Sequence, residues 1–327
     1  MPQAPMRPHR RRGDYVDVSS TSAPDGPSPD WKLAVQAFLE DARSRNCSPA
    51  TIGNYGTYLL SPRTDQFLRD FKIESVADVT PGKLRSFQAE LIDAGLSPGT
   101  VATFHRIIRN FLGYCRRQGW GVGAETLDVA SPRLPNVEPE TYTAAEERRI
   151  VESARTGRDR FLVEFMLRTG LRLSEVAAVT LDDIVISADG AYLRVSQVKA
   201  RDERIVPLDT GTFRFQPKIS SYIRGDRPAA TKARHLFLTS RRDPNTRDYR
   251  PLEPQGIKML LRRLGQDTGL HVHAQKFRDT FAARALASGV DSLVVQRALG
   301  HSTLAMVDRF AHFQDRDVIN AWRARAD

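Results

Sequence analysis

The sequence is poor in cysteine, and its cysteines are isolated. Only two occur in 327 residues, Cys47 and Cys115. Both fall in stretches that we expect to be helical, and neither belongs to a cluster of metal-ligating residues. This usage argues against a fold held together by disulfide bonds. We expect neither a metal ion nor another cofactor.

Long apolar runs are missing as well. No run approaches the ~20 residues that a helix needs to cross a bilayer, and the basic N-terminus lacks the apolar segment of a secretion signal. We therefore expect no membrane partner and a cytoplasmic location, at the nucleoid if the partner is DNA.

Positive charge is what the sequence has in excess. Lys and Arg number 49 against 39 Asp and Glu, a formal net charge of +10, and arginine is commoner than lysine. This balance favours a polyanionic partner because the planar guanidinium suits phosphate, although basic surfaces also serve solubility. The length suits two domains, and 40% hydrophobic with 27% charged residues is typical of soluble globular proteins.

The first 120 residues divide into a basic tail and a helical unit. Residues 1–28 hold four arginines and little that a core could bury, so we expect a disordered tail, solvated rather than bound to DNA. Residues 29–120 place a hydroxyl residue before a proline at Ser48, Thr80 and Ser97, which predicts helix starts and a four-helix unit. An apolar stripe after Ser97 leaves one basic side. The candidate DNA-binding residues of that side are Arg106, Arg109, Arg116 and Arg117.

A linker and a mixed second domain follow. Residues 121–140 are rich in Gly and Pro and lack periodicity, which predicts an interdomain linker. Residues 141–312 open with a capping box at Thr143 and Glu146, and Asp189-Gly190 predicts a hairpin turn. Expected strands cover 184–187, 191–197 and 204–208, expected helices cover 212–223 and 254–264, and a short apolar run covers 235–239. The predicted fold class is mainly α with a small antiparallel β-sheet.

Three short motifs in the second domain carry the chemistry. Arg172 stands in RTGLRLSE, Arg278 in QKFRDTF, and His301 in LGHS, nine residues before Phe310. These motifs and their spacing resemble the tyrosine recombinase (phage integrase) family, whose pattern is T-G-x-R-x-S-E, then H-x-x-R-H, L-G-H and a nucleophilic tyrosine. The resemblance spans residues 29–312 and implies a helical core-binding domain followed by a catalytic domain.

Phosphoryl transfer needs cations fixed on the phosphate, and two arginines are candidates. Arg172 precedes a helix that we expect Ser174 to cap, so its guanidinium and the free helix amides could bind one phosphate. By resemblance, Glu175 orients Arg172. Arg278 lies three residues after Gln275, on the same side of a predicted helix.

Lys199, in SQVKARDERIVPL, is the candidate acid for the leaving oxygen, because lysine gives up a proton readily in a cationic site. The segment resembles the lysine-bearing hairpin of the family, G-K-G-x-x-x-R-x-V-P-L. Arg201 is too basic to act as an acid and is a candidate DNA contact. By resemblance, His301 contacts the scissile phosphate and helps to position the nucleophile.

Two positions depart from the family pattern. Gln275 replaces the first histidine and can hydrogen-bond to phosphate, but it cannot carry a proton at neutral pH. Phe310 replaces the nucleophile, and no tyrosine lies beyond Tyr249. The chain should therefore bind DNA without cleaving it. A Tyr→Phe replacement made to trap the DNA-bound state is the explanation we favour, and a naturally inactive relative is the other.

The resemblance implies site-specific strand exchange through a 3′-phosphotyrosyl link. It also implies a homotetramer on two double-stranded DNA sites with inverted half-sites, and a tail helix at 313–327 that docks on a neighbouring protomer. Accessory proteins and the DNA sequence stay open. A DNA-binding regulator that has lost the chemistry is the main alternative, and a relaxer similar to type IB topoisomerases is a weaker one.

Overall fold

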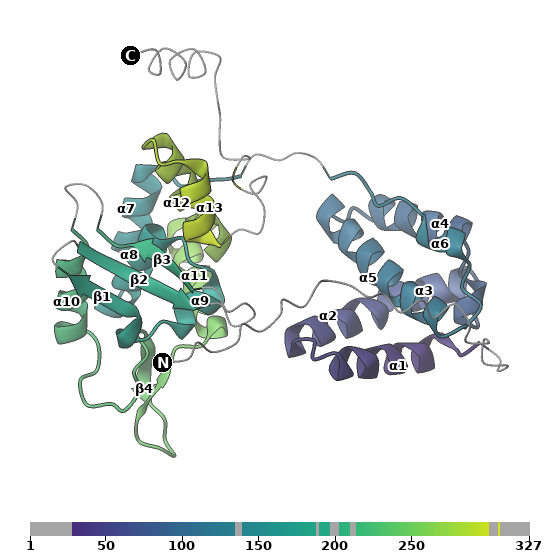
Figure 1. Cartoon of the computed structure of the whole chain (residues 1–327), viewed down its shortest axis with the longest axis horizontal. Helices are drawn as coiled ribbons and strands as arrows, with labels where there is room; N and C mark the ends of the chain where they lie inside the picture. Colours follow the sequence, from purple (N-terminus) through teal and green to yellow (C-terminus); the bar gives the residue numbers. More distant parts are fainter. Residues whose placement is uncertain are drawn as a thin grey trace, which may run out of the picture. The chain divides into compact units, whose positions relative to one another are not determined.

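The computed structural model describes residues 28–134, 139–187, 190–196, 203–209, 214–300 and 307. The chain divides into two compact units between residues 136 and 137. Helices predominate and the strands form two small antiparallel sheets (Figure 1), so the predicted fold class is confirmed. In the part of the chain that the structure describes, no helix is both long and apolar enough to cross a membrane.

The helices of the first unit start where the sequence predicted. Ser48, Thr80 and Ser97 each accept a hydrogen bond from the backbone amide three residues later, and a fourth such start at Ser61-Pro62 was not predicted. It divides one expected helix in two, so five helices rather than four precede residue 120 in the described part of the unit. They are α1 (Trp31–Ser44), α2 (Pro49–Leu59), α3 (Pro62–Asp70), α4 (Pro81–Asp93) and α5 (Pro98–Arg117). Cys47 lies in the turn between α1 and α2, not in a helix as expected.

The 20-residue helix α5 is the centre of the first unit. Its apolar face is buried against α1, where Trp31 and Phe38 approach Phe111 with ring centroids 4.8 and 5.6 Å apart. Helix α6 (Ala124–Leu127) packs on α4 and α5, and Thr126 Oγ1 donates to the Val79 carbonyl at 3.2 Å. Part of the stretch predicted as a linker is therefore folded onto this unit.

The second unit combines one three-stranded sheet with helices. Strands β1, β2 and β3 are antiparallel neighbours in sequence order. The elements, in order, are α7 (Ala144–Ser153), α8 (Gly157–Thr169), α9 (Leu173–Ala178), β1 (Ile184–Ser187), β2 (Gly190–Ser196), β3 (Glu203–Pro207), α10 (Gln216–Gly225), β4 (Leu238–Arg242), β5 (Tyr249–Pro251), α11 (Pro254–Thr268), α12 (Ala274–Ala287) and α13 (Ser292–Leu299). Short 3-10 turns cover Val76–Asp78 in the first unit and Leu181–Asp183 in the second.

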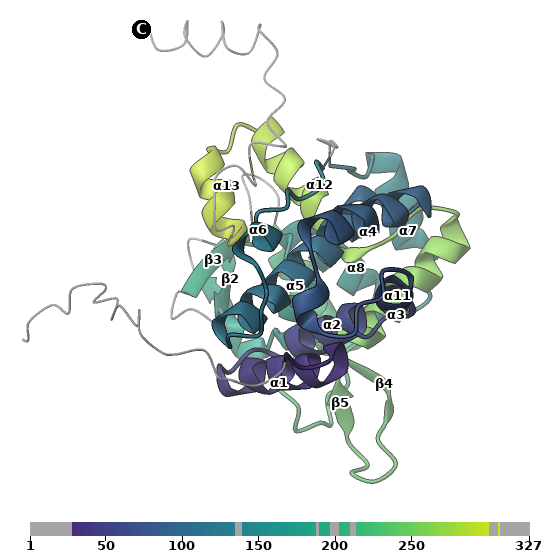
Figure 2. The same cartoon turned by 90° about the vertical axis from the view of Figure 1, so that its right-hand side faces the viewer.

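Several boundaries in the second unit differ from the prediction. Strand β2 lies one residue earlier than 191–197 at both ends, α10 begins at Gln216 rather than 212, and α11 extends to Thr268. The apolar run at 235–239 enters a hairpin, β4 and β5, that projects from the unit in Figures 1 and 2. These strands are short, and β4 ends in two arginines, so hydrophobic alternation gave no signal.

Gly170 brings two helices of the second unit close together. It ends α8 with φ +58°, the left-handed conformation that glycine adopts most easily. A Cβ at this position would lie 2.7 Å from Cδ1 of Phe281 on α12. The approach of α8 and α12 therefore requires glycine here, and it places the Gly170 carbonyl beside the following site.

Candidate active site

Arg172 is the residue that immediately precedes α9. The helix begins at Leu173, so the expected cap at Ser174 is wrong, and Arg172 itself occupies the N-cap position. The Glu175 carboxylate accepts the backbone amide of Arg172 at 2.8 Å and its Nη1 at 3.1 Å. Glu175 thus fixes both the backbone and the guanidinium of Arg172, whose side chain remains 42% exposed.

Arg278 lies in α12 and is only 3% exposed. Its Nη1 donates to the Gly170 carbonyl at 2.8 Å and its Nη2 donates to the Leu299 carbonyl at 2.7 Å. Burial first, and then the charge of Arg172, lower its pKa to about 10, which leaves it protonated at neutral pH. Two candidate cations from distant segments therefore lie close enough to repel each other.

The C-terminal end of α13 joins these arginines to a third one. Arg172 Nη2 donates to the Gly300 carbonyl at 2.8 Å, next to the Leu299 carbonyl that Arg278 contacts. Arg204 of β3 donates through Nε to the Ala298 carbonyl at 2.8 Å. We call Arg172, Arg204 and Arg278 the arginine cluster. It places positive charge at the negative end of the helix dipole.

Arg204 is the arginine of the hairpin pattern G-K-G-x-x-x-R-x-V-P-L, but the sequence suggested no role for it. It is 4% exposed, and its Nη2 donates to Glu175 Oε2 at 2.7 Å. The alternating burial of β3 places Arg204 and Val206 on the inward face. The alternation is visible in ERIVP, but an inward-facing arginine was not expected because arginine is rarely buried.

Gln275 lies at the start of α12 with a partner one turn later. Its Nε2 donates to Asp279 Oδ1 at 2.7 Å, and Asp279 is 8% exposed. Asp279 stands where the motif H-x-x-R-H has its second histidine, a further departure from the family pattern.

His273 caps α12 by accepting the Lys276 amide. Burial, and then the charge of His271, lower the pKa of His273, so it is neutral at pH 7.

A groove of about 830 Å³ lies beside this end of α12. Its polar lining comes from α11, from the segment before α12 and from the first turn of α12, and it includes Lys258, Arg262, Gln266, His271 and Gln275. Leu173, the residue after Arg172, also lines it. Hydrogen-bond donors therefore continue from the arginine cluster along the surface of α11.

Four of the predicted site residues belong to parts of the second domain that the structure does not describe. Lys199, Arg201, His301 and Phe310 lie outside the described residues. Within the described ranges, no group of three or more His, Cys, Asp or Glu side chains could hold a metal ion.

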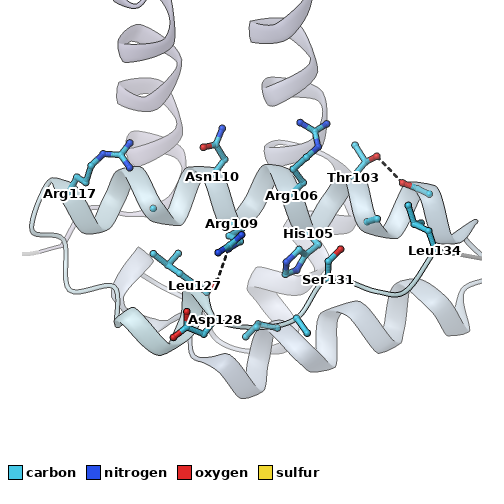
Figure 3. A pocket seen from close by; sticks show the side chains of 15 residues that line it. Thr103, His105, Arg106, Arg109, Asn110, Arg117, Leu127, Asp128, Ser131 and Leu134 are labelled. Atoms are coloured by element: carbon cyan, nitrogen blue, oxygen red, sulfur yellow. Dashed lines mark hydrogen bonds between the residues drawn. The ribbon is translucent and has the colours of Figure 1, made fainter. Parts of the chain in front are cut away.

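The first unit has its own basic groove, of about 1050 Å³, between α5 and residues 127–134 (Figure 3). Arg109 points into it and donates to the Leu127 carbonyl at 2.7 Å. In Figure 3, Arg106, Asn110 and Arg117 point away from that segment, along one edge of α5. Arg106 and Arg117 are exposed, as is Arg116. We use the name α5 groove for the groove together with this exposed arginine edge of α5.

His105 lies in the floor of the α5 groove and is 4% exposed. Its Nδ1 is 2.5 Å from Gln88 Nε2. Burial, and secondarily the charge of Arg109, lower its pKa. His105 is therefore neutral at pH 7 and joins α5 to α4, while the exposed arginines are the groups available to an anion.

Comparison with known proteins places this arrangement in a family. The chain matches the phage integrase family over residues 140–317 and the phage integrase N-terminal SAM-like domain over residues 35–119. It is 31% identical over 281 residues to tyrosine recombinase XerC of Chromobacterium violaceum, which covers 83% of this chain and 87% of that protein. It is 27% identical over 294 residues to XerC of Oceanobacillus iheyensis, with 86% and 92% covered.

Solved structures share the fold. A lambda integrase dimer bound to a COC′ core site has a TM-score of 0.67 at 17% identity and covers 88% of this chain and 80% of that chain. XerH recombinase in a post-cleavage complex with a palindromic difH substrate has a TM-score of 0.64 at 17% identity, with 90% and 84% covered. The helical unit and the α+β unit thus have the fold of a tyrosine recombinase. The chain belongs to the phage integrase family, as its motifs predicted.

Proposed function

We propose that this protein is a site-specific DNA recombinase in which Arg172 and Arg278 bind the two non-bridging oxygens of one backbone phosphate. The observation that carries the proposal is their meeting point. One arginine precedes α9 and the other lies inside α12, yet they donate to the adjacent carbonyls of Gly300 and Leu299. His301 directly follows in the sequence.

The chemistry follows from this placement. With a tyrosine at position 310, the phenolic oxygen attacks the phosphorus while its proton passes to water. The bond from phosphorus to the 5′-oxygen breaks, and that oxygen takes a proton from Lys199. The products are a 3′-phosphotyrosyl bond and a free 5′-hydroxyl. The arginines accelerate the step because they stabilise the extra charge of the pentacoordinate state.

This copy has Phe310 and therefore no attacking oxygen, so it should bind its site and leave the DNA intact. A solved relative supports the idea that such a form remains useful as a DNA-bound state. The Tn1549 transposon integrase with a tyrosine-to-phenylalanine substitution was solved in complex with transposon right-end DNA, with a TM-score of 0.66 at 16% identity.

The test restores the nucleophile. DNA fragments retained by the protein from a randomised pool are read for inverted half-sites, and that site is incubated with Phe310→Tyr and with the unaltered protein. We expect a covalent protein–DNA adduct that withstands denaturation only with Phe310→Tyr. A restored protein that binds the site tightly and never forms the adduct would contradict the proposed chemistry.

The α5 groove is the proposed contact of the first unit with the DNA backbone. Arg106, Arg116 and Arg117 are exposed on one helix, while Arg109 is already hydrogen-bonded to Leu127. Lys258 and Arg262 extend the contact on the second unit. The two units then hold the duplex as a clamp, and Arg201 adds a further contact.

Assembly is proposed from the relatives. A lambda integrase tetramer bound to a Holliday junction has a TM-score of 0.67 with this chain. We propose a homotetramer on two sites, in the cytoplasm at the nucleoid, with residues 313–327 docking on a neighbouring protomer. A protein that lacks this tail and still binds paired half-sites with unchanged cooperativity would rule out the docking.

A DNA-binding regulator is the second candidate. It is favoured by departures from the family motifs at Gln275, Asp279 and Phe310. The adduct experiment separates the two, because a regulator that has lost the other catalytic groups stays inactive after one residue is restored.

A further inference from the structure

Arg204 is a buried arginine for which a purely structural role is costly. Its side chain is 4% exposed, and Nη1 has no hydrogen-bond partner among the residues that the structure describes. Taking a guanidinium out of water is unfavourable unless its donors are paired. An apolar residue on the inward face of β3, like Val206, would avoid that cost. The arginine therefore needs an explanation in what it contacts.

The two contacts of Arg204 lead to both sides of the proposed phosphate site. Nη2 donates to Glu175 Oε2 at 2.7 Å, and the other Glu175 oxygen, Oε1, accepts Arg172 Nη1 at 3.1 Å. Nε donates to the Ala298 carbonyl at 2.8 Å. One side chain thus ties Glu175, which holds Arg172, to the end of α13, which accepts Arg172 Nη2 and Arg278.

The electrostatics of Glu175 agree with this connection. Burial acts to raise its pKa, but the hydrogen bonds from the Arg204 side chain and the Arg172 amide outweigh burial, and the pKa lies below its usual value. Glu175 is therefore ionised at neutral pH. Its carboxylate is fixed by donors from β3 and from Arg172, which leaves it one orientation.

We propose that Arg204 is a positioning residue for strand cleavage that acts on Arg172 by two routes, through Glu175 and through the end of α13, where the Gly300 carbonyl accepts Arg172 Nη2. This inference rests on the proposed function. Arg172 is 42% exposed, so without a fixed Glu175 its guanidinium is held only by the Gly300 carbonyl and can turn away from the phosphate. A misplacement of about 1 Å in such a group costs roughly 100-fold in rate.

A double-mutant cycle in the Phe310→Tyr protein tests the pathway. The variants are Arg204→Met, Arg172→Ala and their combination, measured by single-turnover formation of the covalent adduct at saturating protein. We expect Arg204→Met alone to lose roughly 100-fold. Added to Arg172→Ala, it should lose less than about fivefold, because effects through a shared group are not additive.

A second substrate distinguishes positioning from general damage. A scissile methylphosphonate lacks one non-bridging negative charge, so its cleavage should depend less on Arg172. If Arg204 acts through Arg172, Arg204→Met should lose much less on this substrate than on the phosphodiester. Arg204→Lys keeps the charge but has one nitrogen where arginine uses two, Nε and Nη2, so it should recover part of the rate.

Arg227 supplies the matched control. It is also buried, at 8% exposure, and its Nε and Nη2 donate to the His235 carbonyl at 3.1 and 2.9 Å, away from the arginine cluster. Arg227→Met should lower the urea midpoint without changing the adduct rate of the folded protein. It should also leave the ratio of the adduct rates on the phosphodiester and the methylphosphonate unchanged.

The outcomes separate this inference from the proposed function. If Phe310→Tyr itself forms no adduct, the proposed function is wrong and the inference falls with it. A second outcome is that Phe310→Tyr forms the adduct while the rate losses of Arg204→Met and Arg172→Ala multiply, or while Arg204→Met loses the same factor on both substrates. In either case Arg204 is only structural and the recombinase assignment stands.

Discussion

Replacing Arg278 by methionine should damage cleavage far more than it damages the fold. Two hydrogen bonds are lost, from Nη1 to Gly170 and from Nη2 to Leu299. Hydrogen bonds to charged groups contribute about 1.5–3 kcal/mol each, so the two are worth roughly 3–6 kcal/mol. Methionine is chosen because it fills most of the same volume and leaves little cavity.

The burial of the charge offsets much of that loss. Lowering the pKa from 12.5 to about 10 corresponds to roughly 3 kcal/mol against the charged form. The net destabilisation of Arg278→Met should therefore be no more than about 3 kcal/mol. A domain of ordinary stability, about 5–15 kcal/mol, remains folded after such a loss.

The assay has two parts, in the Phe310→Tyr background. Urea unfolding should show a lower midpoint with an unchanged slope, and the rate of adduct formation should fall by about 100-fold or more. DNA affinity should change by less than about tenfold. Loss of cooperative folding, or a cleavage rate within threefold of the parent, would refute the argument that this buried cation is retained for the phosphate.

The other predictions concern DNA contact, acid stability and backbone geometry. Arg106→Ser with Arg117→Ser should reduce the slope of log affinity against log salt by about 2, whereas the exposed Arg43→Ser should leave it unchanged in filter binding. The lowered pKa of Glu175 contributes stability that is present above its ordinary pKa of 4.5 and is lost as pH falls through the lower folded value. Glu175→Gln should therefore flatten the decline of the urea midpoint below about pH 4.5, and an equally steep decline would contradict this. Gly170→Ala, at φ +58° and against the Phe281 ring, should destabilise the second unit by about 1–3 kcal/mol in urea unfolding, and an unchanged midpoint would contradict the required close approach.

Sequence alone predicted those features of the fold that depend on local chemistry. Caps at Ser48, Thr80 and Ser97 are set by one hydroxyl and one backbone amide, so their signal lies within four residues. The break at Ser61-Pro62 has the same signal and was overlooked. The β4–β5 hairpin could not be predicted by periodicity, because its strands are short and polar.

The candidate site was predictable where a motif named the residue and not where tertiary packing decided the role. Arg172, Glu175 and Arg278 were found through the motifs, and the structure brings them together. Arg204 stands in the hairpin motif, but nothing near it in the sequence indicates its two partners, which lie 29 and 94 residues away. The hydrogen bond from Gln275 to Asp279 could be predicted only by noting that both residues replace histidines of the motif.

The anchoring of α13 has a consequence for building hybrid proteins. Arginines from three separate segments hold the carbonyls of Ala298, Leu299 and Gly300, so the backbone at this point is fixed by the rest of the second unit. Gly300 follows with φ +66°. A C-terminal segment taken from a relative should therefore be joined after Gly300. The grafted segment, with its own histidine and tyrosine, would then start from the same fixed backbone position. A junction placed one turn earlier would exchange the acceptor carbonyls together with the segment.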